Sequence, residues 1–94
     1  MAGEIVGASQ QIISGDVDWP LHGLRHRPVG QTNGWYFWTG ELLSDASFFR
    51  PWHTQHLVDL IPGIEPHLAL EPATRVIYAP DYLDVWHDSS LLDE

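Results

Sequence analysis

Four consecutive aromatic residues lie between two glycines in the segment GWYFWTGE (34–41). Aromatic side chains favour the extended backbone and glycines commonly bound a strand, so this segment predicts a β-strand. Side chains alternate along a strand, which places Trp35 and Phe37 on one face and Tyr36 and Trp38 on the other. Because both faces are apolar, we expect a central strand, covered on both faces by the protein or on one face by a partner.

The rest of the chain is divided into short elements by 7 prolines and 8 glycines in 94 residues. This length suits a single domain, 1–94. Shorter patterns predict a flexible arm or edge strand in 1–15 and a loop over 27–34. They predict helical structure in the middle of the chain: a turn begun by Ser44 in 42–51, a helix over 52–62 and further turns in 63–70. Two more strands are predicted at 74–79 and within 81–88. Their sum predicts an α+β fold, a small and mostly antiparallel sheet with short helices packed on one face.

Two expectations concern burial. In the predicted helix over 52–62, Trp52, His56 and Leu60 recur every four residues, which predicts that they form its apolar face. Trp86 lies in the last predicted strand, and we expect it in the core because tryptophan is mostly buried in folded proteins.

Charge is the most unusual bulk property, because 13 acidic residues face four arginines and no lysine, for a formal net charge of -9. A nucleic-acid or anionic membrane surface would need cations to bind it, so the composition argues against both partners. Negative charge can simply keep a small protein soluble. Where it serves recognition, the partner should be basic.

The chain has no cysteine, which excludes disulfides and thiolate chemistry. A reducing compartment fits this composition. The first residues lack the basic start and apolar run of a secretory signal, and no stretch reaches the roughly 18 apolar residues of a membrane span. We therefore expect a cytoplasmic protein.

No motif for catalysis stands out, since the chain contains neither a nucleophile elbow nor a phosphate-binding glycine loop. Paired carboxylates are expected by chance in so acidic a chain. We therefore predict no enzyme activity and no cofactor. His53 and His56, three residues apart on a predicted helix, could share a metal, although the tighter spacing typical of a zinc site is absent and capping or packing explains them as well.

The C-terminal stretch 81–94 combines acidic residues with aromatic ones and contains no basic residue. It is either a solvated acidic tail or an interface in which charge steers a basic partner and an aromatic side chain anchors it. The predicted partner-binding residues lie in this stretch and after the aromatic strand: Glu41, Asp45, Asp81, Tyr82, Asp84 and Asp88.

Three segments carry a family resemblance: GLRHRPVGQTNGWYFWTGE (23–41), FFRPWHTQHL (48–57) and RVIYAPDYLDVWHDSSLL (75–92). In order and spacing they resemble the thirty-third class of immunity proteins of bacterial polymorphic toxin systems, over roughly residues 20–92. The resemblance implies an α+β domain that binds and neutralises a cognate toxin domain without catalysis. It implies no functional residue by itself.

The leading hypothesis is therefore a cytoplasmic immunity protein whose acidic surface binds a basic toxin domain, with no nucleic acid or membrane as partner. Two alternatives stay open. The first is a metal-binding or small-ligand-binding protein built around His53 and His56, and the second is an acidic inhibitor that mimics nucleic acid.

Overall fold

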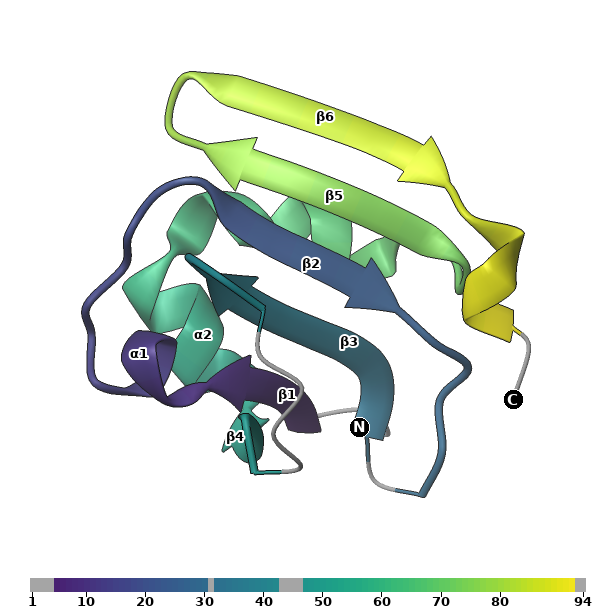
Figure 1. The fold of residues 1–94 in the computed structure, drawn as a ribbon, viewed down its shortest axis with the longest axis horizontal. Coiled ribbons are helices and arrows are strands. Elements are labelled where there is room, and N and C mark those ends of the chain that lie inside the picture. Colours follow the sequence, from purple (N-terminus) through teal and green to yellow (C-terminus); the bar gives the residue numbers. More distant parts are fainter. Residues whose placement is uncertain (1–4, 31, 43–46, 93–94) are drawn as a thin grey trace.

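The aromatic run forms β3 (Thr32–Thr39), an interior strand of a six-stranded sheet. The computed structural model describes residues 5–30, 32–42 and 47–92. Within these residues the strand order is β4-β1-β3-β2-β5-β6, and only the β1–β3 pair is parallel (Figure 1). The predicted α+β fold with a mostly antiparallel sheet is confirmed, and so is the central place of the aromatic strand.

The remaining elements are short, as the density of proline and glycine predicts. The other strands are β1 (Ile5–Ser9), β2 (Leu21–Arg25), β4 (Phe49–His53), β5 (Thr74–Ala79) and β6 (Tyr82–His87). The helices are α1 (Gln10–Ile13), α2 (Thr54–Leu60) and the two 3-10 helices η1 (Pro62–Ala69) and η2 (Ser89–Leu92). The sequence left the first 15 residues open between an arm and an edge strand, and β1 lies inside the sheet between β4 and β3.

One face of the sheet is covered by α2 and η1, which lie behind it in Figure 1, and Ile12 of α1 joins the same core from the end of β1. Trp35 and Phe37 point into this layer and are almost fully buried, with their rings stacked 5.2 Å apart between centroids. The core around them consists of Val6, Ala8, Ile12, Leu21, Leu57, Ile61, Ile64 and Val76. The alternation predicted for β3 is therefore confirmed on this face.

The 3-10 helix η1 is fastened to the sheet by side chains that reach its backbone carbonyls. Trp35 Nε1 donates a hydrogen bond to the carbonyl of Leu68 at 3.0 Å, and Arg25 donates to the same carbonyl at 3.4 Å and to that of Leu70, the residue after η1, at 2.6 Å. The Arg25 guanidinium also lies 5.8 Å from the centroid of the Trp35 ring. A 3-10 segment that contains Pro66 has weak internal bonding, so these contacts explain why it stays ordered against the sheet.

The helix predicted over 52–62 exists, but it is shorter and buries a different face. Residues 49–53 pair with β1 as strand β4, so α2 begins only at Thr54. Leu57 is its buried residue, whereas His56 and Leu60 are exposed, and the predicted stripe is therefore wrong. Because Trp52 belongs to the edge strand β4 and not to the first turn of the helix, different residues of the helix face the core. The predicted turn at Ser44 falls outside the described residues.

Among the described residues, the opposite face of the sheet, which we call the open face, carries no helical layer like that of α2 and η1 (Figure 1). Trp38 on this face is nevertheless only 7% exposed. Its ring stacks on His22 at 5.3 Å and meets the edge of Phe49 at 6.0 Å. Side chains of neighbouring strands therefore cover Trp38, and the protein itself covers this part of both faces of β3.

Gly23 of β2 tests how closely this core is packed. A Cβ at Gly23 would lie 2.6 Å from the Phe37 ring and 2.9 Å from a methyl group of Val76. Gly23→Ala should therefore lower the free energy of unfolding by about 1–3 kcal/mol, measured by urea denaturation. The same substitution in a Phe37→Leu background should cost less, and equal costs in the two backgrounds would show that the Phe37 contact is not the reason.

Candidate functional site at the acidic end of the sheet

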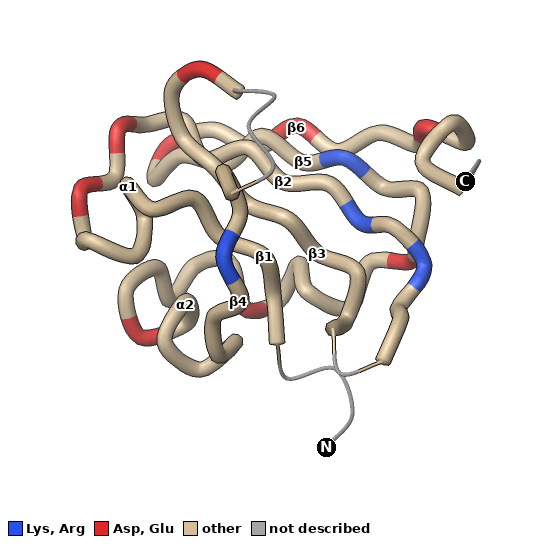
Figure 2. The backbone as a smooth tube through the Cα atoms, turned by 60° about the horizontal axis from the view of Figure 1, so that its bottom comes forward, with Lys and Arg blue, Asp and Glu red and all other residues tan. Residues whose placement is uncertain are grey.

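Charged side chains are distributed unevenly over the sheet. The strand register brings the end of β3, the start of β2 and the turn between β5 and β6 to one end. Exposed carboxylates gather there, and we call this set the acidic end: Asp16, Asp18, Glu41, Asp81 and Asp84. In Figure 2 red segments predominate on the left of the molecule, where this end lies.

Three arginines lie at the opposite end: Arg25 ends β2, Arg75 follows the first residue of β5, and Arg27 lies just beyond β2. In Figure 2 blue segments lie on the right. Arg25 is bound to η1 and Arg75 donates to Asp88 at 2.6 Å, so two of these cations already have partners inside the protein. Arg50 lies on β4, at the far edge of the sheet from β6. Among the described residues, no carboxylate of the acidic end forms an ion pair with an arginine.

The β5–β6 hairpin projects this charge into solvent together with large apolar side chains. All six residues of β6 are exposed, and Tyr82, Leu83, Val85 and Trp86 are between 40% and 53% exposed. The prediction that Trp86 is buried is wrong. The reason is that β6 is the last strand of the sheet and its residues make no part of either core cluster.

The predicted partner-binding residues are partly brought together. Asp81, Tyr82 and Asp84 are exposed on the hairpin, and Glu41 emerges from β3 at the same end of the sheet. Asp45 lies outside the described residues.

Asp88 differs from these residues because it is half-buried and bonded within the protein. Its carboxylate accepts hydrogen bonds from Ser90 Oγ at 2.6 Å, from the Ser90 backbone at 3.1 Å and from Arg75 Nε at 2.6 Å. The hydrogen bond from Ser90 and then that from Arg75 lower the pKa of Asp88 to about 2. Asp88 thus connects β5 to η2, whose Leu91 is buried on the open face.

Sequence reasoning missed the contribution of the loop before β2. Asp16 and Asp18 belong to the acidic end, and Trp19 beside them is exposed while the edge of its ring meets Tyr78 at 5.9 Å. The segment DVDWP (16–20) combines acidic residues with an aromatic one, as the C-terminal stretch does. The same pattern could therefore have predicted that this loop belongs to the interface.

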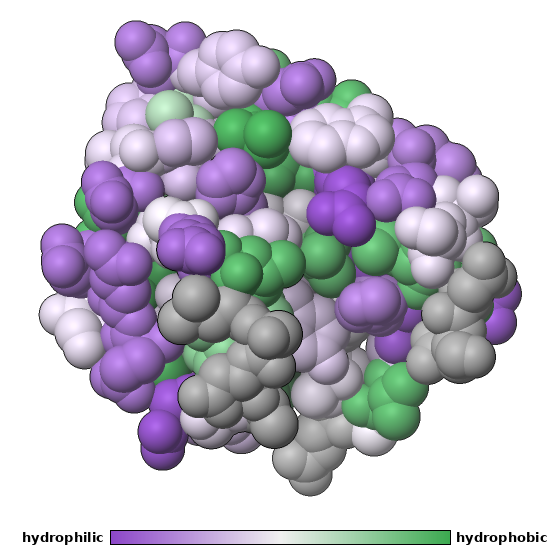
Figure 3. Space-filling view, in the orientation of Figure 1, coloured by the Kyte–Doolittle hydropathy of each residue, from purple (hydrophilic) through white to green (hydrophobic). Residues whose placement is uncertain are grey.

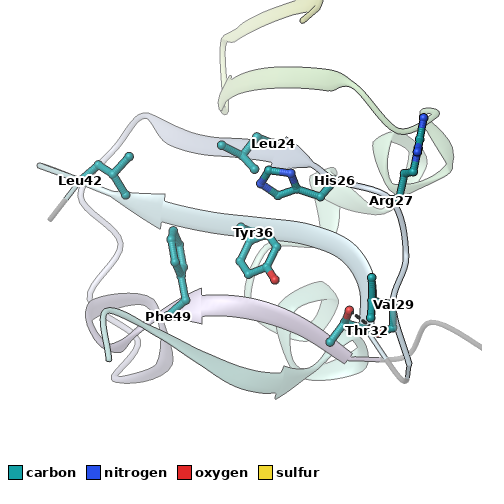
Figure 4. Close-up of a pocket in the computed structure, with 8 residues that line it drawn as sticks. All are labelled: Leu24, His26, Arg27, Val29, Thr32, Tyr36, Leu42 and Phe49. Carbon is teal, nitrogen blue, oxygen red and sulfur yellow. Dashed lines mark hydrogen bonds between the residues drawn. The ribbon is translucent and has the colours of Figure 1, made fainter. Parts of the chain in front are cut away.

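The open face also contains a hollow of about 480 Å³ beside β3. Figure 4 shows the side chains that line it: Leu24, His26, Arg27, Val29, Thr32, Tyr36, Leu42 and Phe49. Figure 3, in the orientation of Figure 1, shows apolar and polar side chains mixed over this face. One ring nitrogen of His26 is already paired with the carbonyl of Leu91 at 2.8 Å.

Comparison with known proteins identifies the family. A family model of the Imm33-like domain matches residues 2–88, nearly the whole chain. The chain belongs to the Imm33-like domain family. This match confirms the resemblance found in the sequence. A search of curated proteins gave no match, and neither did a search of solved structures.

The two histidines considered as metal ligands lie together in this Imm33-like domain, where β4 passes into α2. The rings of His53 and His56 are 5.4 Å apart between centroids, and both residues are exposed. Within the described ranges, no group of three or more histidine, cysteine, aspartate or glutamate side chains could hold a metal ion. The pair also lies outside the residues that line the hollow.

None of the helices in the described part of this Imm33-like domain has the length and apolar character needed to cross a bilayer.

The role of Asp88 can be tested by acid titration of stability. Because the pKa of Asp88 is lowered on folding, its ionised form stabilises the protein above pH 4, and this contribution disappears as the pH falls toward about 2. Asp88→Asn should therefore lower the melting temperature at pH 7, and the difference from wild type should shrink between pH 4 and 2. Asp84→Asn is the matched control, since it removes an exposed carboxylate and should change little. A constant difference for Asp88→Asn across this pH range would contradict the assignment.

Proposed function

We propose that this protein is an immunity protein that binds and neutralises a cognate bacterial toxin domain in the cytoplasm. It acts by binding and performs no catalysis. Membership of the Imm33-like domain family supports the general role. Binding through the acidic end is supported by the separation of charge, since unneutralised carboxylates lie at one end of the sheet and most of the arginines at the other.

Such a charge distribution favours a partner with a basic surface. Carboxylates that lack neighbouring cations produce a field that speeds the encounter with a cationic protein and orients it before contact. Asp81 and Asp84 flank Tyr82 on the hairpin, so an exposed aromatic ring lies within the same patch. Aromatic residues often supply much of the binding energy once water is excluded, so Tyr82 is the proposed anchor.

The proposed contact residues are those predicted from the sequence, extended by the loop that precedes β2. The exposed residues among those predicted are Glu41, Asp81, Tyr82 and Asp84. The neighbouring loop adds Asp16 and Trp19 to the proposed contact surface. By occupying a basic active site or by blocking access to it, this surface would prevent the toxin from reaching its substrate.

The proposal is tested with any toxin domain that a gene adjacent to this one is found to encode. The domain should stop growth when it is expressed alone, and co-expression of this protein should restore growth. Purified together, the two proteins should form a complex that is detected by titration calorimetry. Continued growth arrest and no complex with any adjacent toxin domain would reject the immunity function.

Charge reversal tests the acidic end separately. Asp81→Lys with Asp84→Lys should slow association with the toxin domain roughly tenfold at low salt and weaken the dependence of the rate on salt. The matched control is Asp59→Lys with Glu65→Lys, which changes the net charge equally but alters exposed positions in α2 and η1. Association rates can be measured by stopped-flow fluorescence. Equal slowing by both pairs would mean that only net charge matters, and no slowing by either would remove the electrostatic part of the proposal.

A further inference from the structure

The outer edge of β6 presents unused backbone hydrogen-bonding groups. Among the described residues β6 pairs only with β5, and the Asp88 N–H donates to the Ala73 carbonyl at 2.7 Å just beyond the last paired position. Backbone groups alternate in direction along an antiparallel ladder, so those of Asp84 and Trp86 point toward β5. The N–H and C=O groups of the alternating residues, Leu83, Val85 and His87, consequently point outward.

This edge lacks most of the features that usually prevent strands from associating. Residues 82–87 contain no proline, lysine or arginine, and their pairing with β5 is regular, without a bulge. The other edge strand, β4, carries Pro51 and continues directly into α2. The two edges therefore differ, and the β6 edge is the one suited to accept another strand.

Side chains on both faces of β6 would contact an added strand. Leu83 and Val85 share the face on which Val76 is buried, and both remain exposed. Tyr82 and Trp86 lie on the open face, with Asp84 between them. A partner strand with lysine or arginine near Asp84 would gain an ion pair and a cation–π contact with the flanking rings. Its alternate residues would meet Leu83 and Val85 and should be apolar.

Charge also distinguishes between the two kinds of strand that could occupy the edge. Pairing with a second copy of this chain would bring together two proteins that each carry a net charge of -9. It would also place the Asp84 carboxylates of the two copies near one another, and like charges across a strand pair are destabilising. A basic partner meets neither penalty.

We infer that β6 binds the partner by strand addition: an extended segment that alternates basic and apolar residues joins the sheet as its seventh strand. This inference rests on the proposed immunity function, since the segment belongs to the toxin domain. It goes beyond that function because it specifies backbone pairing at one edge, whereas charge steering alone requires only an acidic surface.

Hydrogen exchange provides a direct test, with the inactivated toxin domain of the adjacent gene as the probe. In the free protein, NMR should show slower exchange at the Asp84 and Trp86 amides than at those of Leu83, Val85 and His87. In the complex, the three outward amides should become protected by at least about tenfold. A complex that leaves these three amides exchanging at the rates of the free protein would overturn the inference.

A proline substitution tests the same edge by mutation. Val85→Pro removes an outward N–H without removing a bond to β5, a position that an edge strand tolerates. Val85→Pro should weaken binding to the toxin domain by at least about tenfold, whereas the matched control Val85→Ala, which keeps the N–H, should weaken it less than about threefold. Circular dichroism monitors folding of both variants. Leu83→Pro and its control Leu83→Ala form a second pair of variants at an outward position. If neither proline variant folds, hydrogen exchange of the wild-type complex decides whether strand addition occurs.

The outcomes separate this inference from the proposed function. Wild-type binding that both proline variants retain would reject strand addition and leave the immunity function standing. Failure of the wild-type protein to bind the toxin domain would reject both. A dimer of this chain alone in solution that Val85→Pro dissociates, seen by light scattering, would assign the edge to a second copy and overturn the inference.

Discussion

The attachment of η1 to the sheet through Trp35 and Arg25 is the interaction on which the rest of the architecture depends. Two side chains from adjacent strands donate hydrogen bonds to carbonyls in and directly after a 3-10 helix that has poor internal bonding. This attachment completes the helical layer over Trp35 and Phe37, and it uses one of only four arginines in the chain. α2 and η1 are thereby committed to one face, and the described residues provide no comparable layer for the other face or for β6.

The one-sided layer has consequences for function. A sheet of six strands is wider than the short helices that cover it, so the last strand, β6, lies beyond the two core clusters, whereas Val76 of β5 is still part of the core. The apolar side chains of β6 stay exposed although they are large, as Trp86 shows. Exposed apolar residues beside unneutralised carboxylates are costly for an isolated protein but suit one that associates with a basic partner. The strand that the fold leaves uncovered, β6, is thus also the one proposed to bind the partner.

Sequence reasoning succeeded where local pattern and tertiary environment agree. The alternation in β3 and the β-branched residues of β5 placed both strands close to their observed bounds. It failed where hydrogen bonding between strands determined a conformation that the local sequence pattern does not predict. The residues before α2 could continue a helix, but hydrogen bonds to β1 hold them extended, which moves the buried position to Leu57. The burial of Trp86 was misjudged because the composition of a strand does not reveal whether it is first, middle or last in its sheet.

By itself, the sequence determined the chemistry of this protein: a cysteine-free, acidic chain with an aromatic central strand and the ordered segments of its family. These properties depend on residue type and local spacing. Only the tertiary structure decided which carboxylates stand together, that Asp88 is bonded to Arg75 and Ser90 whereas Asp84 is exposed, and that β6 pairs on one side only among the described residues. Each of these depends on strand order and register, which join residues far apart in the chain and leave no mark in local sequence.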